Sequence, residues 1–274
     1  MQEITVIIPW YRYSEIIRCL NSLSRSIIPK YHKVLLIDDN TDISDLTNKV
    51  KEFCKTHSFV YYRNRKNIGY TSSAKKGMEL TKTDVVLLNS DTIVTRNFLN
   101  KLSKHAYMDS RVATVTPMSN QANMFSLSCQ NLLKLTHGVA IINKILEITY
   151  LNKNVSVFSG HGFCLYIKRS VINQIGVLDD FTFPGTYCEE NDYCLRCSRK
   201  GYKHIVALDT FVYHQGRGTH GDFERTNLLS INYPRLLKKY PEIPQMIERY
   251  YSEKPLRKPH QLISLIDKIV AKVV

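Results

Sequence analysis

The chain has 274 residues, of which 43% are hydrophobic and 23% are charged, and its formal net charge is +14 at pH 7. This length and composition allow one large α/β domain or two small ones with a well-packed core, and they exclude a disordered or collagen-like chain. Lys and Arg are spread along the chain without a zinc-finger, RNA-recognition or helix-turn-helix signature, so we expect no nucleic-acid binding despite the basic charge.

The cysteines and the N-terminus indicate the cell compartment. Seven scattered cysteines do not resemble the even framework of a small secreted protein. The apolar run after Met1 lacks a basic start, and no run of about 18 uncharged apolar residues occurs. We therefore expect a cytoplasmic protein with reduced thiols.

Cys194 and Cys197, with Cys188 and His204 nearby, could form a zinc or redox site. No second such pair exists, however, and cysteines at this spacing on a helix commonly pack together.

The first ninety residues alternate between apolar strands and helical patterns. Residues 4–9 form a continuous apolar run that ends at a proline, and Ser14 is placed to cap a helix that Pro29 terminates. Further strands are expected at 34–37, 59–62 and 84–88, and helices at 45–54 and 72–80. This order predicts an α/β fold with a doubly wound, mostly parallel sheet and a ligand site beyond the carboxyl ends of its strands.

The second half has weaker patterns. We expect a long helix or loop at 130–152, strands at 155–159 and 162–167, and a short helix at 170–175 that ends at Gly176. A helix should follow the acidic stretch 189–192 and stop at Gly201. Strands at 205–207 and 210–213 then deliver His214 to a loop, and a proline-rich tail ends in the amphipathic stretch 262–274.

Polar residues follow the predicted strands, where a ligand should bind. Asp91, in Asn89-Ser90-Asp91, could hold a divalent cation, Mg²⁺ or Mn²⁺, that neutralises a leaving nucleotide diphosphate; a simple turn is the alternative. The pair Asp38-Asp39 suits the hydroxyls of a ribose, although it could equally be a turn that caps the next helix.

Two further groups could carry chemistry. Crowding within Glu189-Glu190-Asn191-Asp192, just ahead of the predicted helix, can raise the pKa of one carboxylate toward that of a general base, although helix capping alone could explain the cluster. His214 could bind a metal while Arg217 faces a diphosphate, although a lone histidine is more often structural.

Five motifs, in chain order, resemble glycosyltransferase family 2. They are Val6-Ile7-Ile8-Pro9-Trp10-Tyr11, Leu36-Ile37-Asp38-Asp39, Asn67-Ile68-Gly69-Tyr70, Leu87-Leu88-Asn89-Ser90-Asp91-Thr92 and Glu189-Glu190-Asn191-Asp192. The stretch 159–169 and the Tyr-His-x-Gly-x-Gly segment 213–218 are similar to those of bacterial rhamnosyl- and galactofuranosyltransferase-like members.

The resemblance implies a GT-A fold and assigns residues to the donor and the metal. Asp91 and His214 would bind the metal, although Asn89 stands where the family's Asp-x-Asp motif has its first aspartate. The donor-binding residues would be Pro9, Trp10, Tyr11, Asp38, Asp39, Asn67, Gly69, Asn89, Ser90, Asp91 and Arg217.

The same resemblance implies the chemistry. Glu190 falls at the catalytic base, where aspartate is common, with Glu189 beside it and Asp192 opening the helix. The expected enzyme is an inverting, metal-dependent glycosyltransferase. It would move a sugar from a UDP- or dTDP-linked donor to a hydroxyl of a glycan or lipid-linked glycan, in bacterial surface polysaccharide synthesis. The alternatives are an inactive sugar-nucleotide-binding module and a basic membrane or nucleic-acid adaptor.

The expected organisation is a GT-A domain at 1–225 and a basic helical tail at 226–274. Residues 1–116 would form the nucleotide-binding half and residues 117–225 the acceptor and catalytic half. The tail could dock the enzyme on the inner face of the cell membrane, or it could be a helix packed on the domain or on a dimer partner. The oligomeric state is not predicted.

Overall fold

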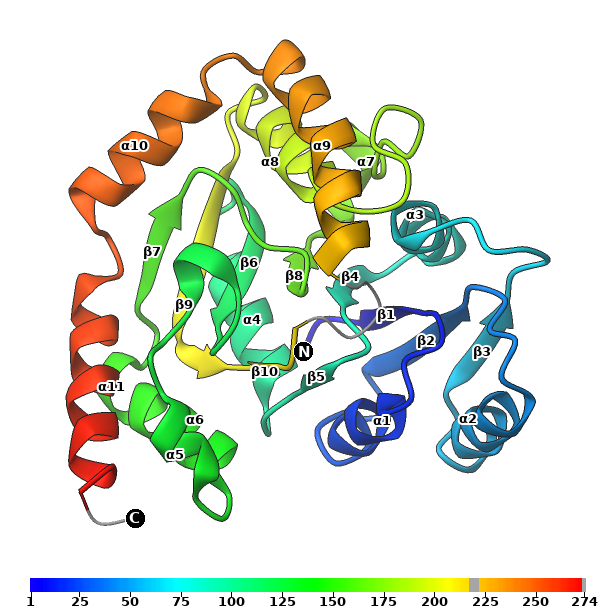
Figure 1. Cartoon of the computed structure of the whole chain (residues 1–274), viewed down its shortest axis with the longest axis horizontal. Helices are drawn as coiled ribbons and strands as arrows, with labels where there is room; N and C mark the ends of the chain where they lie inside the picture. Colours follow the sequence, from blue (N-terminus) through cyan, green and yellow to red (C-terminus); the bar gives the residue numbers. More distant parts are fainter. Residues whose placement is uncertain (217–221, 273–274) are drawn as a thin grey trace.

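A computed structural model describes residues 1–216 and 222–272 of the chain, with side chains omitted at 222–225. An eight-stranded sheet lies at its centre in the order β3-β2-β1-β4-β8-β6-β9-β7 (Figure 1). β7 and β8 run antiparallel to their neighbours, and the other strands are parallel, which confirms the expected doubly wound, mostly parallel sheet. The strands are β1 (Ile4–Trp10), β2 (His32–Asp38), β3 (Val60–Arg63), β4 (Asp84–Leu88), β6 (Val112–Met118), β7 (Asn154–Val157), β8 (Cys164–Ile167) and β9 (Lys203–Phe211).

Helices cover both faces of the sheet, because its central strands are apolar on both sides. In β1, Ile4, Val6 and Ile8 pack in one core cluster with α1 and α4, whereas Ile7 packs in a second cluster with α3 and α7. The helices up to β9 are α1 (Ile16–Ser24), α2 (Ser44–Thr56), α3 (Tyr70–Leu80), α4 (Phe98–Tyr107), η1 (Asn123–Phe125), α5 (Gln130–Lys134), α6 (Gly138–Tyr150), α7 (Arg169–Ile175) and α8 (Glu189–Ser198).

A second, two-stranded sheet crosses the carboxyl edge of the large one. β5 (Thr92–Ile93) pairs antiparallel with β10 (Tyr213–His214), with His214 opposite Thr92. The backbone N–H of Gln215 also donates to the carbonyl of Asp91 at 3.0 Å. Residues far apart in the sequence are therefore fixed side by side at the end of β4.

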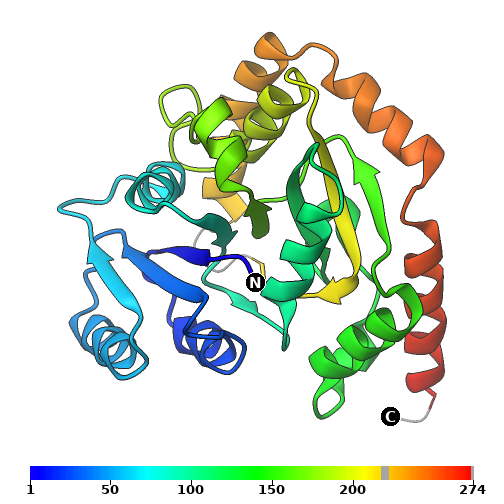
Figure 2. The same ribbon diagram turned by 180° about the vertical axis from the view of Figure 1, so that it is seen from behind.

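The C-terminal helices pack against the body of the domain. α9 (Asp222–Lys239) lies beside α8, and α10 (Ile243–Glu253) and α11 (Arg257–Val270) run along the far edge of the sheet (Figures 1 and 2). On α11, Ile263 is buried, and Asp267 accepts hydrogen bonds from the backbone of Leu132 and the amide of Asn131. The structure therefore places the tail helix on the domain. Within the described ranges, none of the helices combines the length and the apolar composition that crossing a membrane requires.

Several predicted boundaries were wrong for identifiable reasons. β1 continues through Pro9 to Trp10, because pairing with β4 stops at Ile7 and the proline therefore removes no bond on that side. α1 begins at Ile16 without a side-chain cap, so Ser14 is not its cap. The region 130–152 forms two helices, which are separated at His137 by a residue in the left-handed conformation.

Two corrections concern residues 189–213. α8 begins at Glu189, so the acidic cluster forms the first turn of this helix and does not precede it. The two short strands expected at 205–207 and 210–213 are mainly one strand, β9, because the intervening Leu208 and Asp209 are buried and continue the strand. Gly176 ends α7 with φ of +88°, as predicted.

Candidate active site

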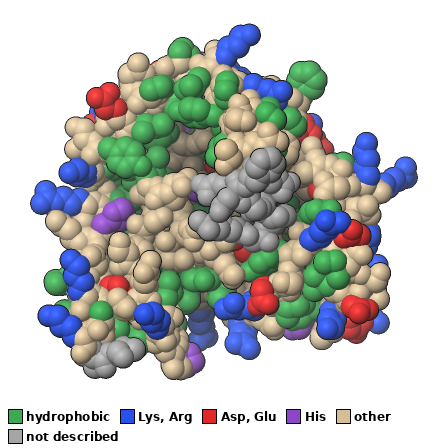
Figure 3. Space-filling view, viewed as in Figure 1, with side chains coloured by type: hydrophobic (Ala, Val, Ile, Leu, Met, Phe, Trp, Pro, Cys, Tyr) green, Lys and Arg blue, Asp and Glu red, His purple; other side chains and the backbone are tan. Residues whose placement is uncertain are grey.

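A cavity of about 480 Å³ opens at the carboxyl ends of β1, β2 and β4, where the order of the sheet reverses. Figure 3 shows the surface hollowed on this face, with hydrophobic side chains along its rim. Most of the residues singled out in the sequence line it: Pro9, Trp10, Tyr11, Asp39, Asn67, Gly69, Asn89, Ser90, Asp91, Glu189, Glu190 and His214. Arg217 lies outside the described residues.

The two adjacent aspartates after β2 have different environments. Asp39 lines the cavity, and its carboxylate accepts hydrogen bonds from the backbone N–H groups of Ile68 and Gly69 and from the amide of Asn64, at 2.8–2.9 Å. Asp38 does not line the cavity. It is fully buried and pairs with Arg63 and the hydroxyl of Tyr61. Of the two aspartates, Asp39 is therefore the one that lies at the cavity.

Trp10 and Gly69 shape the same end of the cavity. The indole of Trp10 is buried and donates to the carbonyl of Tyr13 at 2.9 Å, so it fixes the loop after β1. Gly69 has φ of +83°, and a Cβ at this position would lie 3.0 Å from the Cα of Gly185. This close approach joins the nucleotide-binding half of the cavity to the loop that precedes α8.

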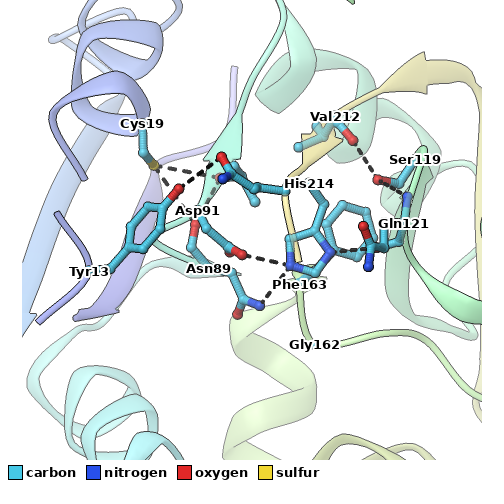
Figure 4. Close-up of polar contacts among 12 residues, drawn as sticks. Tyr13, Cys19, Asn89, Asp91, Ser119, Gln121, Gly162, Phe163, Val212 and His214 are labelled. Carbon is cyan, nitrogen blue, oxygen red and sulfur yellow. Dashed lines mark hydrogen bonds and ion pairs between the residues drawn. The ribbon is translucent and has the colours of Figure 1, made fainter. Parts of the chain in front are cut away.

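His214 and Asp91 face each other at the end of β4 (Figure 4). His214 Nε2 lies 3.3 Å from Asp91 Oδ1 and 3.3 Å from the amide nitrogen of Asn89, and its Nδ1 contacts the carbonyl of Gln121. The ring also stacks on Phe163, with centroids 5.2 Å apart. When Nδ1–H donates to the carbonyl, Nε2 of the neutral ring keeps a lone pair that could bind a metal.

These contacts determine the direction in which the pKa of His214 is shifted. Burial is the largest single influence and favours the neutral ring, but the hydrogen bond and charge of Asp91, together with the Gln121 carbonyl, outweigh it and raise the pKa of His214 above its usual value.

The Asp91–His214 pair fits a divalent cation. Two ligands at right angles on one ion, with bonds of about 2.1 Å, lie roughly 3 Å apart, which is close to the observed 3.3 Å. In the part of the chain that the structure describes, no three His, Cys, Asp or Glu residues come together as a metal site. An ion at this pair would therefore take its remaining ligands from a bound diphosphate and from water.

Glu189, which is buried, and Glu190, which is half-buried, form a carboxylate pair that also lines the cavity. One oxygen of each, Oε2, has no hydrogen-bond partner among the described residues. Burial raises the pKa of Glu190, whereas backbone groups of Gly162 and Asn191 stabilise its ionised form. Burial and the charge of Glu190 raise the pKa of Glu189 well above its ordinary 4.5. The backbone groups around Glu190 thus favour its ionised form, whereas burial and the charge of Glu190 oppose ionisation of Glu189.

Asp192 does not line the cavity, although the sequence grouped it with the catalytic residues. It is fully buried, and it pairs with Arg196 at 2.8 Å and with Lys239 at 2.6 Å. The hydroxyl of Tyr240 donates to it at 2.9 Å. Asp192 therefore ties the first turn of α8 to the end of α9.

Sequence reasoning did not single out four further residues of the cavity wall. Gln121 and Asn123 fall in residues 117–225, which were expected to include the acceptor site, but no local pattern marked them, and Leu229 and Tyr233 come from α9. The described residues that line the cavity include four acidic side chains and no Lys or Arg. In a chain of net charge +14, this makes the cavity an acidic site.

The seven cysteines are all buried and free, so the structure shows no disulfide. The Sγ of Cys194 accepts a hydrogen bond from the backbone N–H of Gly160 at 3.3 Å. Within the described ranges, Cys194 and Cys197 belong to no metal cluster.

Comparisons with known proteins agree with this geometry. The family described as glycosyl transferase family 2 matches residues 5–176. The low-salt glycan biosynthesis hexosyltransferase Agl10 of Haloferax volcanii is 22% identical over 206 residues, which are 73% of this chain and 63% of that relative. The chain thus spans less than two thirds of the length of this curated relative.

Two solved structures share the fold. The mannosyltransferase PcManGT of Pyrobaculum calidifontis, in complex with GDP-Man and Mn²⁺, has a TM-score of 0.66 at 15% identity over 96% of this chain and 73% of that chain. GalNAc-T7, with UDP, GalNAc and Mn²⁺, has a TM-score of 0.62 at 16% identity over 84% of this chain and 48% of that chain. These likenesses confirm the GT-A fold, while the narrower likeness to rhamnosyl- and galactofuranosyltransferases stays a prediction.

The family match covers more than half of the chain and includes four of the five motifs that carried the resemblance; of the fifth, Glu189, Glu190 and Asn191 line the same cavity. This chain therefore belongs to glycosyltransferase family 2.

Proposed function

We propose that this chain is an inverting, metal-dependent glycosyltransferase that moves one sugar from a nucleotide-diphosphate donor to a hydroxyl of a glycan or lipid-linked glycan. The observation that carries the proposal is one cavity lined both by Asp91 and His214, whose separation fits a cation, and by Glu190, a carboxylate of raised pKa. A donor diphosphate at the pair and an acceptor hydroxyl at the carboxylate would both fit within this space.

The donor end combines Asp39 and the loop after β1 with the Asp91–His214 pair. Asp39, Pro9 and Tyr11 lie where the ribose and base would bind, and Asn67 and Gly69 frame that end. When bound, a divalent cation would neutralise the charge that develops on the departing nucleotide diphosphate. Asp91 and His214 would hold it there.

The charge of the cavity favours dependence on a metal. A nucleotide diphosphate is strongly anionic, and the described lining residues offer it the carboxylates of Asp39, Asp91 and Glu190 and no Lys or Arg. Without a cation the donor would be repelled, because like charges that are shielded from water interact strongly. Arg217, which we expected to face the diphosphate, would supply a single further positive charge.

The acceptor end offers one general base. Glu190 lines the cavity, and backbone groups of Gly162 and Asn191 favour its ionised form, so we assign to it the role of taking a proton from an acceptor hydroxyl. The deprotonated oxygen would attack the anomeric carbon in line as the nucleotide diphosphate leaves, which inverts the configuration in a single displacement. Glu189 and Asp192 have supporting roles in this proposal.

For the substrates, we propose the chemical class of the donor and of the acceptor. The solved structures of similar fold hold GDP-Man or UDP with Mn²⁺, and the curated relative is a hexosyltransferase of glycan biosynthesis. We infer a UDP- or dTDP-linked sugar donor, a glycan acceptor and a role in surface polysaccharide synthesis. A location in the cytoplasm, on the inner face of the membrane, would suit a lipid-linked acceptor.

Thermal unfolding with a panel of UDP-, dTDP- and GDP-sugars, each with Mn²⁺, with Mg²⁺ and with EDTA, tests the donor and metal parts of this proposal. A ligand that binds the folded state raises its apparent stability by about 2.7 kcal/mol at 100 times its Kd. We expect a shift with one nucleotide class that EDTA removes. A shift that survives EDTA contradicts metal dependence, and a panel without any shift contradicts donor binding.

Asn89 favours one other candidate, a sugar-nucleotide-binding module without catalysis. Asn89 stands where the family's Asp-x-Asp motif has its first aspartate. Asn89 and Asp91 together therefore carry one negative charge fewer for a cation. Donor-induced stabilisation without release of nucleotide diphosphate, in the presence of a wide set of glycan acceptors, would identify this candidate.

A further inference from the structure

The loop that leads into α8 has an unusual backbone. Gly185, Tyr187 and Cys188 all have positive φ, at 79°, 74° and 74°. A side-chain-bearing residue in this region costs roughly 1–2 kcal/mol, and such strain persists where surrounding contacts fix the backbone. Cys188 is the N-cap of α8, directly ahead of Glu189 and Glu190. The conformation of this loop therefore determines where the two carboxylates enter the cavity.

Contacts from two other parts of the fold hold four consecutive carbonyls of this loop. On one side, Thr71 of α3 donates to the carbonyl of Gly185 through its backbone N–H at 2.8 Å and through its hydroxyl at 3.1 Å. On the other side, the amide of Asn232 donates to the carbonyls of Pro184, Thr186 and Tyr187 at 3.1, 2.9 and 3.2 Å.

Asn232 belongs to α9 and is fully buried. Its removal would leave three carbonyls without this donor, and a buried polar group without a partner costs about 1–3 kcal/mol. Through Asn232, α9 therefore stabilises the backbone that precedes Glu189 and Glu190. No local motif in the sequence marks Asn232.

We propose that Asn232 is a positioning residue for sugar transfer, which holds the strained loop 184–188 so that Glu190 faces the acceptor hydroxyl. The proposal rests on the proposed function, in which Glu190 is the base. Asn232 itself does not line the cavity, so it acts through the loop.

The rest of α9 is consistent with this role. Leu229 and Tyr233, which are close to Asn232 on the same helix, line the cavity wall. Beyond them, Lys239 and Tyr240 reach Asp192 in the first turn of α8. The segment 229–240 thus holds the loop before α8 and the first turn of α8 at separate points. Figure 1 shows the two helices side by side.

The test compares Asn232→Ala with Asn227→Ala, which changes an exposed asparagine on the same helix. Misplacement of a catalytic group by about 1 Å can cost roughly 100-fold in rate, so we expect kcat of Asn232→Ala to fall by about 10- to 100-fold. The Kd of the nucleotide-sugar donor in the presence of Mn²⁺ should change by less than about threefold, because Asp39, Asp91 and His214 belong to other elements and touch neither Asn232 nor its bonded carbonyls. A role confined to stability would lower Tm and leave kcat of the folded enzyme unchanged.

Hydrogen exchange supplies a readout that does not depend on activity. Amides of residues 184–192 should exchange faster in Asn232→Ala than in the wild type, while Asn227→Ala leaves them unchanged. If the Asn232→Ala variant does not fold, Asn232→Ser, which keeps one hydroxyl donor, carries the same comparison. Wild-type kcat together with unchanged exchange in the folded variant would overturn the proposal.

The two proposals fail in distinguishable ways. If the wild-type protein transfers no sugar from any donor, the proposed function fails, while the exchange measurement still tests whether Asn232 holds the loop. If the wild type is active and Asn232→Ala matches it, the positioning role alone is wrong.

Discussion

Replacing Glu189 with glutamine should stabilise the protein, and the gain should grow with pH. The Glu189 side chain is 3% exposed, its Oε2 has no partner among the described residues, and Glu190 lies beside it. Ionising Glu189 in the folded state would place a second negative charge in this buried space, which is why its pKa is raised well above 4.5.

The sign follows from proton linkage. Below pH 4.5 Glu189 is protonated in both the folded and the unfolded chain, so its ionisation costs nothing. As the pH rises above 4.5 the unfolded chain releases this proton while the folded chain retains it, so the free energy of unfolding decreases with pH until the folded group also ionises. The glutamine side chain of the Glu189→Gln variant cannot ionise and escapes this loss. Each pKa unit between the folded and the unfolded chain lowers the free energy of unfolding by about 1.4 kcal/mol once the unfolded group is ionised, which corresponds to roughly 2–3 °C in Tm for a chain of this size.

The assay is thermal unfolding of wild type, Glu189→Gln and Glu248→Gln at pH 5 and pH 8, without metal or donor. Glu248 is exposed on α10 and serves as the matched control. We expect Glu189→Gln to gain little at pH 5 and several degrees at pH 8, while the control shows no such trend. A Glu189→Gln advantage that shrinks as the pH rises would refute the reasoning about the carboxylate pair.

Three further variants test separate parts of the account. Glu190→Gln should keep the donor-induced rise in Tm but lower kcat by about 100- to 10,000-fold, because it removes the general base; full activity in a transfer assay would show that another group accepts the proton. Asp91→Ala should lose the Mn²⁺-dependent part of the donor-induced shift, whereas the exposed control Asp45→Ala keeps it; an undiminished shift would place the ion elsewhere. Tyr166→Phe removes a buried hydroxyl that donates to Asp84, so urea unfolding should show a loss of about 1.5–3 kcal/mol with kcat unchanged, and unchanged stability would contradict the assigned bond.

The sequence predicted the nucleotide-binding half well because its signals are local. The apolar runs of buried parallel strands and the polar residues at their carboxyl ends follow directly from the fold, and β4 was predicted with its observed bounds. The predicted convergence of Pro9, Asp39, Asn89 and Asp91 is confirmed by the shared cavity. Their individual roles in binding stay predictions.

Tertiary contacts decided what the sequence left open. Asp38 and Asp39 are chemically identical, and the pairing of β2 with β3, which brings Arg63 and Tyr61 to Asp38, separates the two. The choice between Glu189 and Glu190 likewise depends on burial and on the backbone around Gly162. Asn232 has no local signal, because its partners lie more than forty residues away in the chain.

The tail shows a similar limit. Its amphipathic pattern fitted either a membrane surface or the domain, because both would bury the same apolar stripe. The buried Asp267, which accepts bonds from the α5 region, places α11 on the domain in the structure. Docking on a membrane through its exposed face stays a prediction.

Transfer itself is the most direct test of the central claim. Release of nucleotide diphosphate and formation of the glycosylated product should be measured together, with the donor selected by thermal shift, a panel of glycan and lipid-linked acceptors, and Mn²⁺ or EDTA. The account predicts acceptor-dependent release by the wild type that EDTA abolishes and that Glu190→Gln lacks. Equal release by the wild type and Glu190→Gln, or release that EDTA does not affect, would contradict it.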